Sequence, residues 1–130
     1  MNKIIALLKF IFHASILLLI ILSLFPGSLL GLLFYGDLAQ QLYLLKNPFG
    51  TTINHFFSYA SVSLLGLILY SRSKYFQKLF YAMLVLSTTL EVLQAVVPNR
   101  AFQLDDLMAN ILGVLFAYSV VKIYLFFKKS

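Results

Sequence analysis

The chain has 130 residues, of which 62% are hydrophobic and 11% charged, whereas soluble domains are about 45–50% apolar. This composition predicts a single-domain integral membrane protein. The absence of cysteine excludes disulfides, thiolate metal sites and thiol nucleophiles. The net charge of +6 does not indicate nucleic-acid binding, because the basic residues lie at the ends of apolar runs.

The first apolar run, Ile4–Leu24, has about the length that crosses a bilayer, and Pro26-Gly27 ends it. It is too long for the apolar core of a signal peptide and no clear cleavage motif follows, so we predict a retained helix. Lys9 can extend to the near interface, whereas His13 lies near mid-depth. We interpret His13 as a neutral side chain bonded to a neighbouring helix; the alternative is a proton relay.

The segment Ser28–Asn47 begins with an apolar piece that is too short to span a membrane. Leu38, Leu42 and Leu45 follow at helical spacing, which predicts an amphipathic segment lying in the interface. In the alternative interpretation, the first helix continues through the apolar piece with a kink at Pro26.

Three later runs are also long enough to span, at about residues 52–70, 76–97 and 106–127. In the last of them, Asp106, Asn110 and Gly113 follow the i, i+4, i+7 spacing and therefore share one helix face. We predict an all-α membrane protein with one domain, residues 1–130. It is a four-transmembrane-helix bundle, with helices at 4–24, 52–70, 76–97 and 106–127 and an interfacial segment between the first two.

The basic residues predict the orientation of this bundle. Four spans place both termini on one side, and most of the lysines and arginines fall on that side or in the link between helices two and three. These residues are Lys3, Lys9, Arg72, Lys74, Lys78, Lys122, Lys128 and Lys129, and only Lys46 and Arg100 fall opposite. Since cytoplasmic loops carry the excess of Lys and Arg, we expect a multi-pass protein of the plasma (inner) membrane with both termini cytoplasmic.

Polar side chains gather at the opposite, outer end of the predicted helices. Three of the chain's four carboxylates lie between residues 91 and 106. An ionised side chain at mid-bilayer costs about 2.5–3.5 kcal/mol, so these groups should pair with one another or face a wet cavity. The candidate ligand-binding residues are His55, Tyr59, Glu91, Gln94, Arg100, Asp106 and Asn110.

The spacing of these residues resembles that of a known family. The motifs are H-F-x-x-Y from His55, E-x-x-Q-x-x-x-P-x-R from Glu91, and D-x-x-x-N-x-x-G from Asp106. They are similar to the VanZ-like family of small membrane proteins, as is S-x-x-P from Ser23. This resemblance implies a membrane-bundle fold and a context in the cell envelope, where the family is linked to glycopeptide (teicoplanin) resistance.

The chain departs from that family pattern at two places. Thr51-Thr52 stands where the family usually has an Asp-Lys pair before its histidine, and Ala117 stands where a glycine is common. The first change affects any mechanism that needs the ion pair, and the second is a mild change in packing. The resemblance implies no particular reaction.

We expect the outer pocket to bind the headgroup of a membrane lipid or a lipophilic envelope molecule. Arg100 would hold a phosphate or carboxylate with its planar fork, and the neutral side chains would add hydrogen bonds. We expect neither a cofactor nor nucleic acid, and the sequence does not identify protein partners.

Three alternatives remain open. An intramembrane hydrolase or transferase would use His55 with Glu91 or Asp106 as its acid/base pair, and Ser58 or a water as nucleophile. The same histidine and carboxylates could hold a divalent metal, but residues known only to share one end are weak evidence, so we predict no metal site. Finally, the polar groups could be a network that only fixes helix register.

Overall fold

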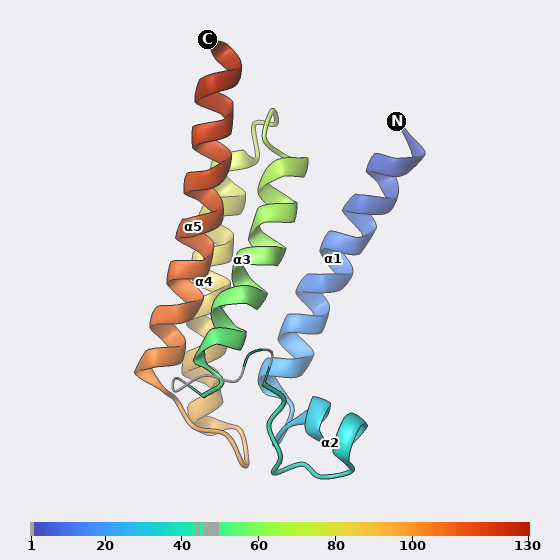
Figure 1. The fold of residues 1–130 in the computed structure, drawn as a ribbon, viewed down its shortest axis with the longest axis vertical. Helices are drawn as coiled ribbons and strands as arrows, with labels where there is room; N and C mark the ends of the chain where they lie inside the picture. Colours follow the sequence, from blue (N-terminus) through green and yellow to red (C-terminus); the bar gives the residue numbers. More distant parts are fainter. Residues whose placement is uncertain (1, 44, 46–49) are drawn as a thin grey trace.

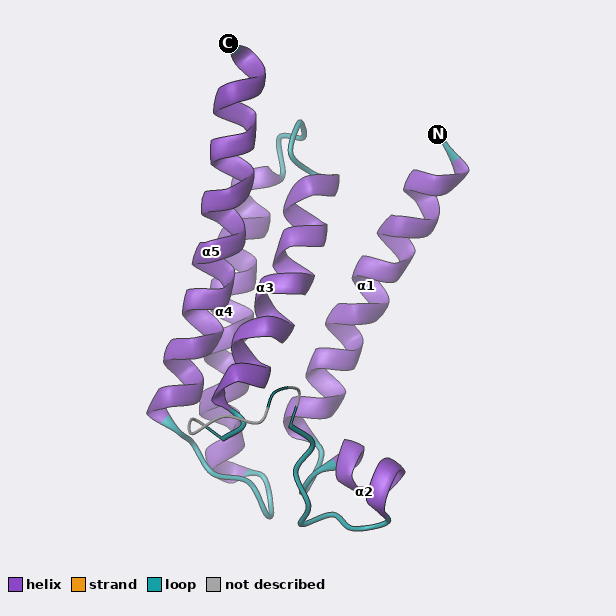
Figure 2. Cartoon of the chain, viewed as in Figure 1, coloured by secondary structure: helices purple, strands orange, loops and turns teal. Residues whose placement is uncertain are grey.

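A computed structural model describes residues 2–43, 45 and 50–130 of the chain. The described part is all-helical, without strands (Figure 2). Its helices are α1 (Lys3–Leu24), α2 (Leu29–Tyr35), α3 (Thr52–Leu69), α4 (Phe76–Leu93) with a 3₁₀ extension (Gln94–Val96), and α5 (Leu104–Lys129). Four of them, all except α2, are long and apolar enough to cross a membrane. The predicted fold class, an all-α membrane protein, is therefore confirmed.

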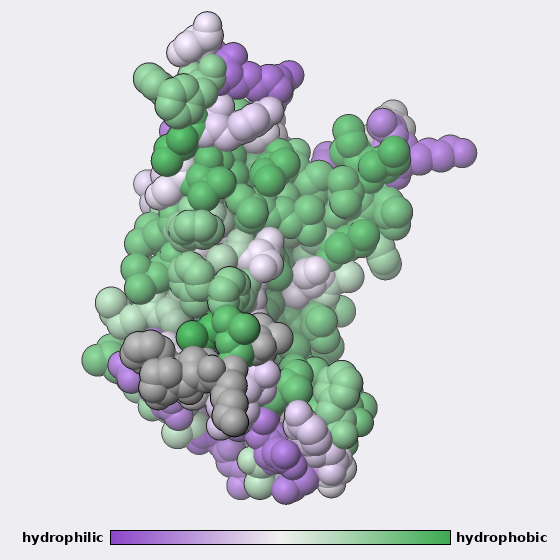
Figure 3. Space-filling model, viewed as in Figure 1, coloured by the Kyte–Doolittle hydropathy of each residue, from purple (hydrophilic) through white to green (hydrophobic). Residues whose placement is uncertain are grey.

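The helices α3, α4 and α5 pack together, while α1 leans away from them towards its N-terminus (Figure 1). The N- and C-termini lie at one end of the molecule, and α2 lies at the other. Figure 3 shows apolar side chains across the middle of the visible face, with hydrophilic residues gathered at both ends. This distribution is the one expected of a bundle that spans a membrane.

Helices α3 and α5 approach closely at Gly113. A Cβ atom at Gly113 would lie 2.6 Å from the carbonyl oxygen of Phe56 and 2.9 Å from the nitrogen of Ala60. Only glycine allows two backbones to come this near, as is common where membrane helices pack. The contact lies one turn from Asn110 and His55, so it positions the polar end of both helices.

Helix α1 buries little of its surface: Phe12 and Leu19 are its buried residues. The ring of Phe12 packs onto Gly66 of α3, where a larger residue would collide with it. We expected His13 to bond to a neighbouring helix. Instead, its Nδ1 lies 2.7 Å from the carbonyl oxygen of Lys9 in its own helix, and among the hydrogen bonds of the described residues none joins it to another helix.

The segment after α1 differs from the predicted one. Its helix, α2, lies at the start of the predicted segment Ser28–Asn47: Ser28 accepts a hydrogen bond from the Gly31 N–H at 2.9 Å, and Gly36, at φ 69°, ends the helix. Leu38 and Leu42 are not helical, despite their spacing. A separate helix of seven residues also replaces the kinked continuation of α1, and it is too short to span. The end of the predicted segment at Asn47 lies outside the described residues.

Candidate functional site

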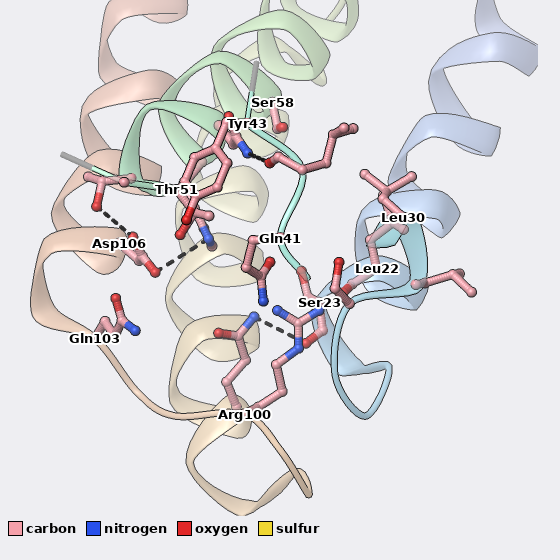
Figure 4. A pocket seen from close by; sticks show the side chains of 18 of the residues that line it. Leu22, Ser23, Leu30, Gln41, Tyr43, Thr51, Ser58, Arg100, Gln103 and Asp106 are labelled. Atoms are coloured by element: carbon pink, nitrogen blue, oxygen red, sulfur yellow. Dashed lines mark hydrogen bonds and ion pairs between the residues drawn. The ribbon is translucent and has the colours of Figure 1, made fainter. Parts of the chain in front are cut away.

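A pocket of about 590 Å³ opens at the end of the bundle that carries α2 (Figure 4). It lies between the end of α1, the chain at residues 41–43, the start of α3 and the loop that joins α4 to α5. Its polar lining includes Ser23, Gln41, Thr52, His55, Ser58, Tyr59, Gln94, Arg100, Gln103 and Asp106. Five of the seven predicted residues therefore line one pocket, and the other two, Glu91 and Asn110, lie buried behind it.

His55 is the centre of the polar contacts. Its Nδ1 lies 3.0 Å from Oδ1 of Asn110 and 3.9 Å from Oε2 of Glu91. On the other edge of the ring, Nε2 lies 3.4 Å from Oδ2 of Asp106. The imidazole thus joins α3 to α4 and to α5, and His55 also lines the pocket. His55 is about one-fifth exposed, whereas the side chains of Glu91 and Asp106 are almost fully buried.

Neighbouring groups hold both carboxylates in place. The backbone N–H of Gln103 donates to Oε1 of Glu91 at 3.2 Å, and the hydroxyl of Thr52 donates to Oδ1 of Asp106 at 2.9 Å. Asn110 donates from Nδ2 to Oε2 of Glu91 and to the Ser87 carbonyl, each at 3.4 Å. Buried charges need such partners, since leaving them unpaired is costly.

Arg100 and Gln94 tie the pocket to the end of α1. The Nε of Arg100 donates to the Phe25 carbonyl at 3.1 Å, and its Nη2 donates to the Leu22 carbonyl at 2.6 Å. Gln94 donates from Nε2 to the Ser23 carbonyl at 3.1 Å. The last carbonyls of a helix have no partner within it, so these side chains complete the hydrogen bonding of α1.

Arg100 does not reach the carboxylates that we expected to meet it. Within the described residues, carboxylate oxygens of Glu91 and Asp106 lie within 4 Å of the ring nitrogens of His55, and neither carboxylate pairs with Arg100. Burial lowers the pKa of the Arg100 guanidinium, and the negative charges of Glu91 and Asp106 oppose that change. The group nevertheless keeps its charge, as arginine does in proteins, so it places a positive charge at the pocket wall.

Two contributors were missed in the sequence. Thr52 was noted only as a departure from the family pattern, yet its hydroxyl holds Asp106. Its position three residues before His55, on the same helix face, was the signal that could have found it. Gln103 contributes its backbone N–H, for which side-chain patterns give no signal.

The arrangement combines hydrogen-bond donors, a positive charge and an imidazole flanked by carboxylates. A histidine held by a carboxylate is a suitable general acid or base. Ser58 lines the same pocket, but among the described hydrogen bonds none joins its hydroxyl to His55. Among the described residues, the site therefore shows no preassembled serine nucleophile.

The fold and the site together define a small four-helix membrane protein with a polar pocket at one end of its bundle. The VanZ/LLP1 family model matches residues 4–127, nearly the whole chain. The chain therefore belongs to the VanZ/LLP1 family, as the motifs indicated. No curated protein and no solved structure matches it significantly.

Proposed function

We propose that the pocket binds the polar headgroup of an amphiphile and so binds, or alters the exposure of, a lipid-linked or lipophilic molecule of the cell envelope. The observation that supports this proposal most strongly is the polar pocket itself, at one end of an otherwise apolar bundle. A headgroup is the part of a membrane molecule that resides at this depth.

The surroundings of the pocket also suit an amphiphile. Leu29 and Leu30 of α2 line the pocket, while Leu33 and Phe34 of the same helix are about 70% exposed. A ligand with its headgroup among Gln94, Tyr59 and His55 could lay its chain along such apolar side chains. Short helices with exposed apolar residues commonly lie at the membrane interface.

The proposed location is the outer face of the plasma membrane, with both termini cytoplasmic. Lysines and arginines are concentrated at the end of the molecule that carries the termini, as cytoplasmic segments usually are. The pocket lies at the opposite end. A role in glycopeptide resistance, suggested by the family resemblance, would fit a site that meets envelope molecules there.

The second candidate is an intramembrane hydrolase or transferase that acts on such a headgroup. It is favoured by the contact of His55 with Asp106 at 3.4 Å and by the nearby Glu91, since this set offers an acid/base pair. Water would then be the simplest nucleophile.

Photo-crosslinking tests the binding proposal. Benzoylphenylalanine at Tyr43, which lines the pocket, should capture a lipid with a polar headgroup in living cells, and mass spectrometry should identify it. The same residue at Tyr124, equally exposed at the other end, is the control. Adducts at Tyr43 that merely reflect the bulk lipid composition, unchanged by Gln94→Leu, would contradict headgroup recognition.

Two variants separate the binder from the enzyme. Replacing His55 by alanine would abolish turnover of a captured lipid, whereas a binder would keep part of its affinity. Arg100→Lys would weaken a binder gradually, because the charge remains while the planar fork is lost. The readouts are the amount of captured lipid and the appearance of cleaved or transferred headgroup.

A further inference from the structure

Three potential metal ligands from three helices lie close together at the wall of the pocket. His55 of α3, Glu91 of α4 and Asp106 of α5 each offer a ligand atom, and these atoms lie within 4.8 Å of one another. From the sequence, a metal at these residues was only a weakly supported alternative, because the sequence shows only that the three residues share one end of the bundle. The structure adds the distances.

The two carboxylates are oriented as metal ligands usually are. In each, one oxygen accepts a bond from outside the cluster: Oε1 of Glu91 from the Gln103 N–H, and Oδ1 of Asp106 from Thr52. The other oxygens lie near the ring of His55: Oε2 of Glu91 is 3.9 Å from Nδ1, and Oδ2 of Asp106 is 3.4 Å from Nε2. Oε2 also accepts a hydrogen bond from Asn110 at 3.4 Å. Such outer hydrogen bonds hold ligating side chains in a fixed orientation.

The two buried carboxylates also have few basic side chains near them to balance their negative charge. Glu91 and Asp106 are 1% and 4% exposed, and buried charges are normally paired or bound to metals. Throughout the described chain, His55 is the one basic side chain within 4 Å of either carboxylate. Arg100 is directed instead to the carbonyls of Leu22 and Phe25.

Tyr59 places a buried hydroxyl in the wall of the same pocket. Tyr59 is 2% exposed, and its hydroxyl lies near the side chain of Ser23, which also lines the pocket. Tyr59 lines the same pocket as His55 and Asp106, one helical turn beyond His55. A ligand that fills the pocket would contact this hydroxyl as well as His55 and Asp106.

We propose that His55, Glu91 and Asp106 bind one divalent cation, Zn²⁺ or Mn²⁺, through one nitrogen and two carboxylate oxygens. Mixed imidazole and carboxylate ligands suit these ions better than they suit Ca²⁺. Three protein ligands leave a coordination position open. That position would take a phosphate oxygen of the headgroup, and this part of the inference rests on the proposed function.

Titration of the metal alone tests the site. Detergent-purified protein is freed of metal with EDTA, and ZnCl₂ or MnCl₂ is then added in a calorimeter without lipid. One ion should bind per chain, and Glu91→Gln, Asp106→Asn and His55→Gln should each weaken binding at least tenfold. Asp105→Asn is the matched control, because Asp105 is exposed and should leave the affinity unchanged. Equal affinity in all four variants, or no binding at millimolar metal, would overturn the site.

A second measurement covers variants that fail to fold. X-ray absorption of the zinc-loaded wild-type protein should show a shell of nitrogen and oxygen with one imidazole, and a shell without imidazole would overturn the assignment.

The Tyr43 crosslink is repeated in EDTA to separate the two proposals. Lipid capture without any metal binding would reject the metal site alone, whereas metal binding without lipid capture would reject the headgroup function alone.

Discussion

The Nε2 of His55 lies 3.4 Å from Oδ2 of Asp106, and so the first turn of α3 is joined to the first turn of α5. Asp105, the preceding residue, is exposed. Adjacent helical residues point about 100° apart, which explains why only one of the two aspartates enters the pocket.

These two aspartates allow a matched comparison. Both lie in the first turn of α5, where an acid interacts favourably with the helix dipole, so Asp105→Asn and Asp106→Asn should share a loss of about 0.3–1 kcal/mol. Asp106→Asn should cost about 1–2 kcal/mol more, because it also weakens the bonds to Thr52 and His55. Unfolding in detergent measures both, and equal losses would contradict the assigned role of Asp106.

The contact between Glu91 and His55 should appear as an energetic coupling. Glu91→Ala should lower the free energy of unfolding by about 3–5 kcal/mol, the range for breaking a buried charged pair. Combined with His55→Ala, the loss should be smaller than the sum of the single losses by about 0.5–3 kcal/mol. A control cycle of His55→Ala with Asp105→Ala should be additive. Strict additivity in the first cycle would show that the two side chains do not interact.

Arg100 should stabilise the end of α1. Arg100→Lys keeps the charge but offers a single ammonium in place of the fork that reaches Leu22 and Phe25, so we expect a loss of about 1–2 kcal/mol. Hydrogen exchange at the amides of residues 22–25 should become faster. Arg72→Lys, at an exposed position near the other end, should change neither quantity. Unchanged exchange in Arg100→Lys would mean that α1 is held by other contacts.

Gly113 should tolerate no side chain. Gly113→Ala would place a methyl group 2.6 Å from the Phe56 carbonyl oxygen, and α5 must then move away from α3 at a cost of about 1–3 kcal/mol. Ser119→Ala, on the exposed side of α5, is the control and should be nearly neutral. If both variants unfold at the same temperature, the close approach of the two helices is not present.

Cysteine labelling checks the proposed orientation. The chain has no native cysteine, so Gln103→Cys introduces a single thiol at an exposed position in the loop before α5. An impermeant maleimide should label it in intact cells. A cysteine in place of Ser73, in the link between α3 and α4, is the control and should react only after lysis. The reverse pattern would place the pocket at the cytoplasmic face.

The four spans and the gathering of polar groups at one end could be predicted, because hydropathy and an even number of crossings depend on sequence alone. The partners of Arg100 could not. It bonds to backbone carbonyls, which every residue carries and no pattern distinguishes. Within the segment Ser28–Asn47, the leucine spacing did not indicate where the helix lies, since the cap at Ser28 and the left-handed Gly36 confine it to Leu29–Tyr35.

The three residues of the cluster, His55, Glu91 and Asp106, lie on helices that are synthesised one after another. His55 and Glu91 enter the membrane with α3 and α4, before the ribosome has made the Asp106 that completes their site. Because both lie near helix ends, water and lipid headgroups can solvate them during this interval. A chain arrested before α5 would therefore hold His55 and Glu91 at one membrane surface without their partners Asp106 and Asn110.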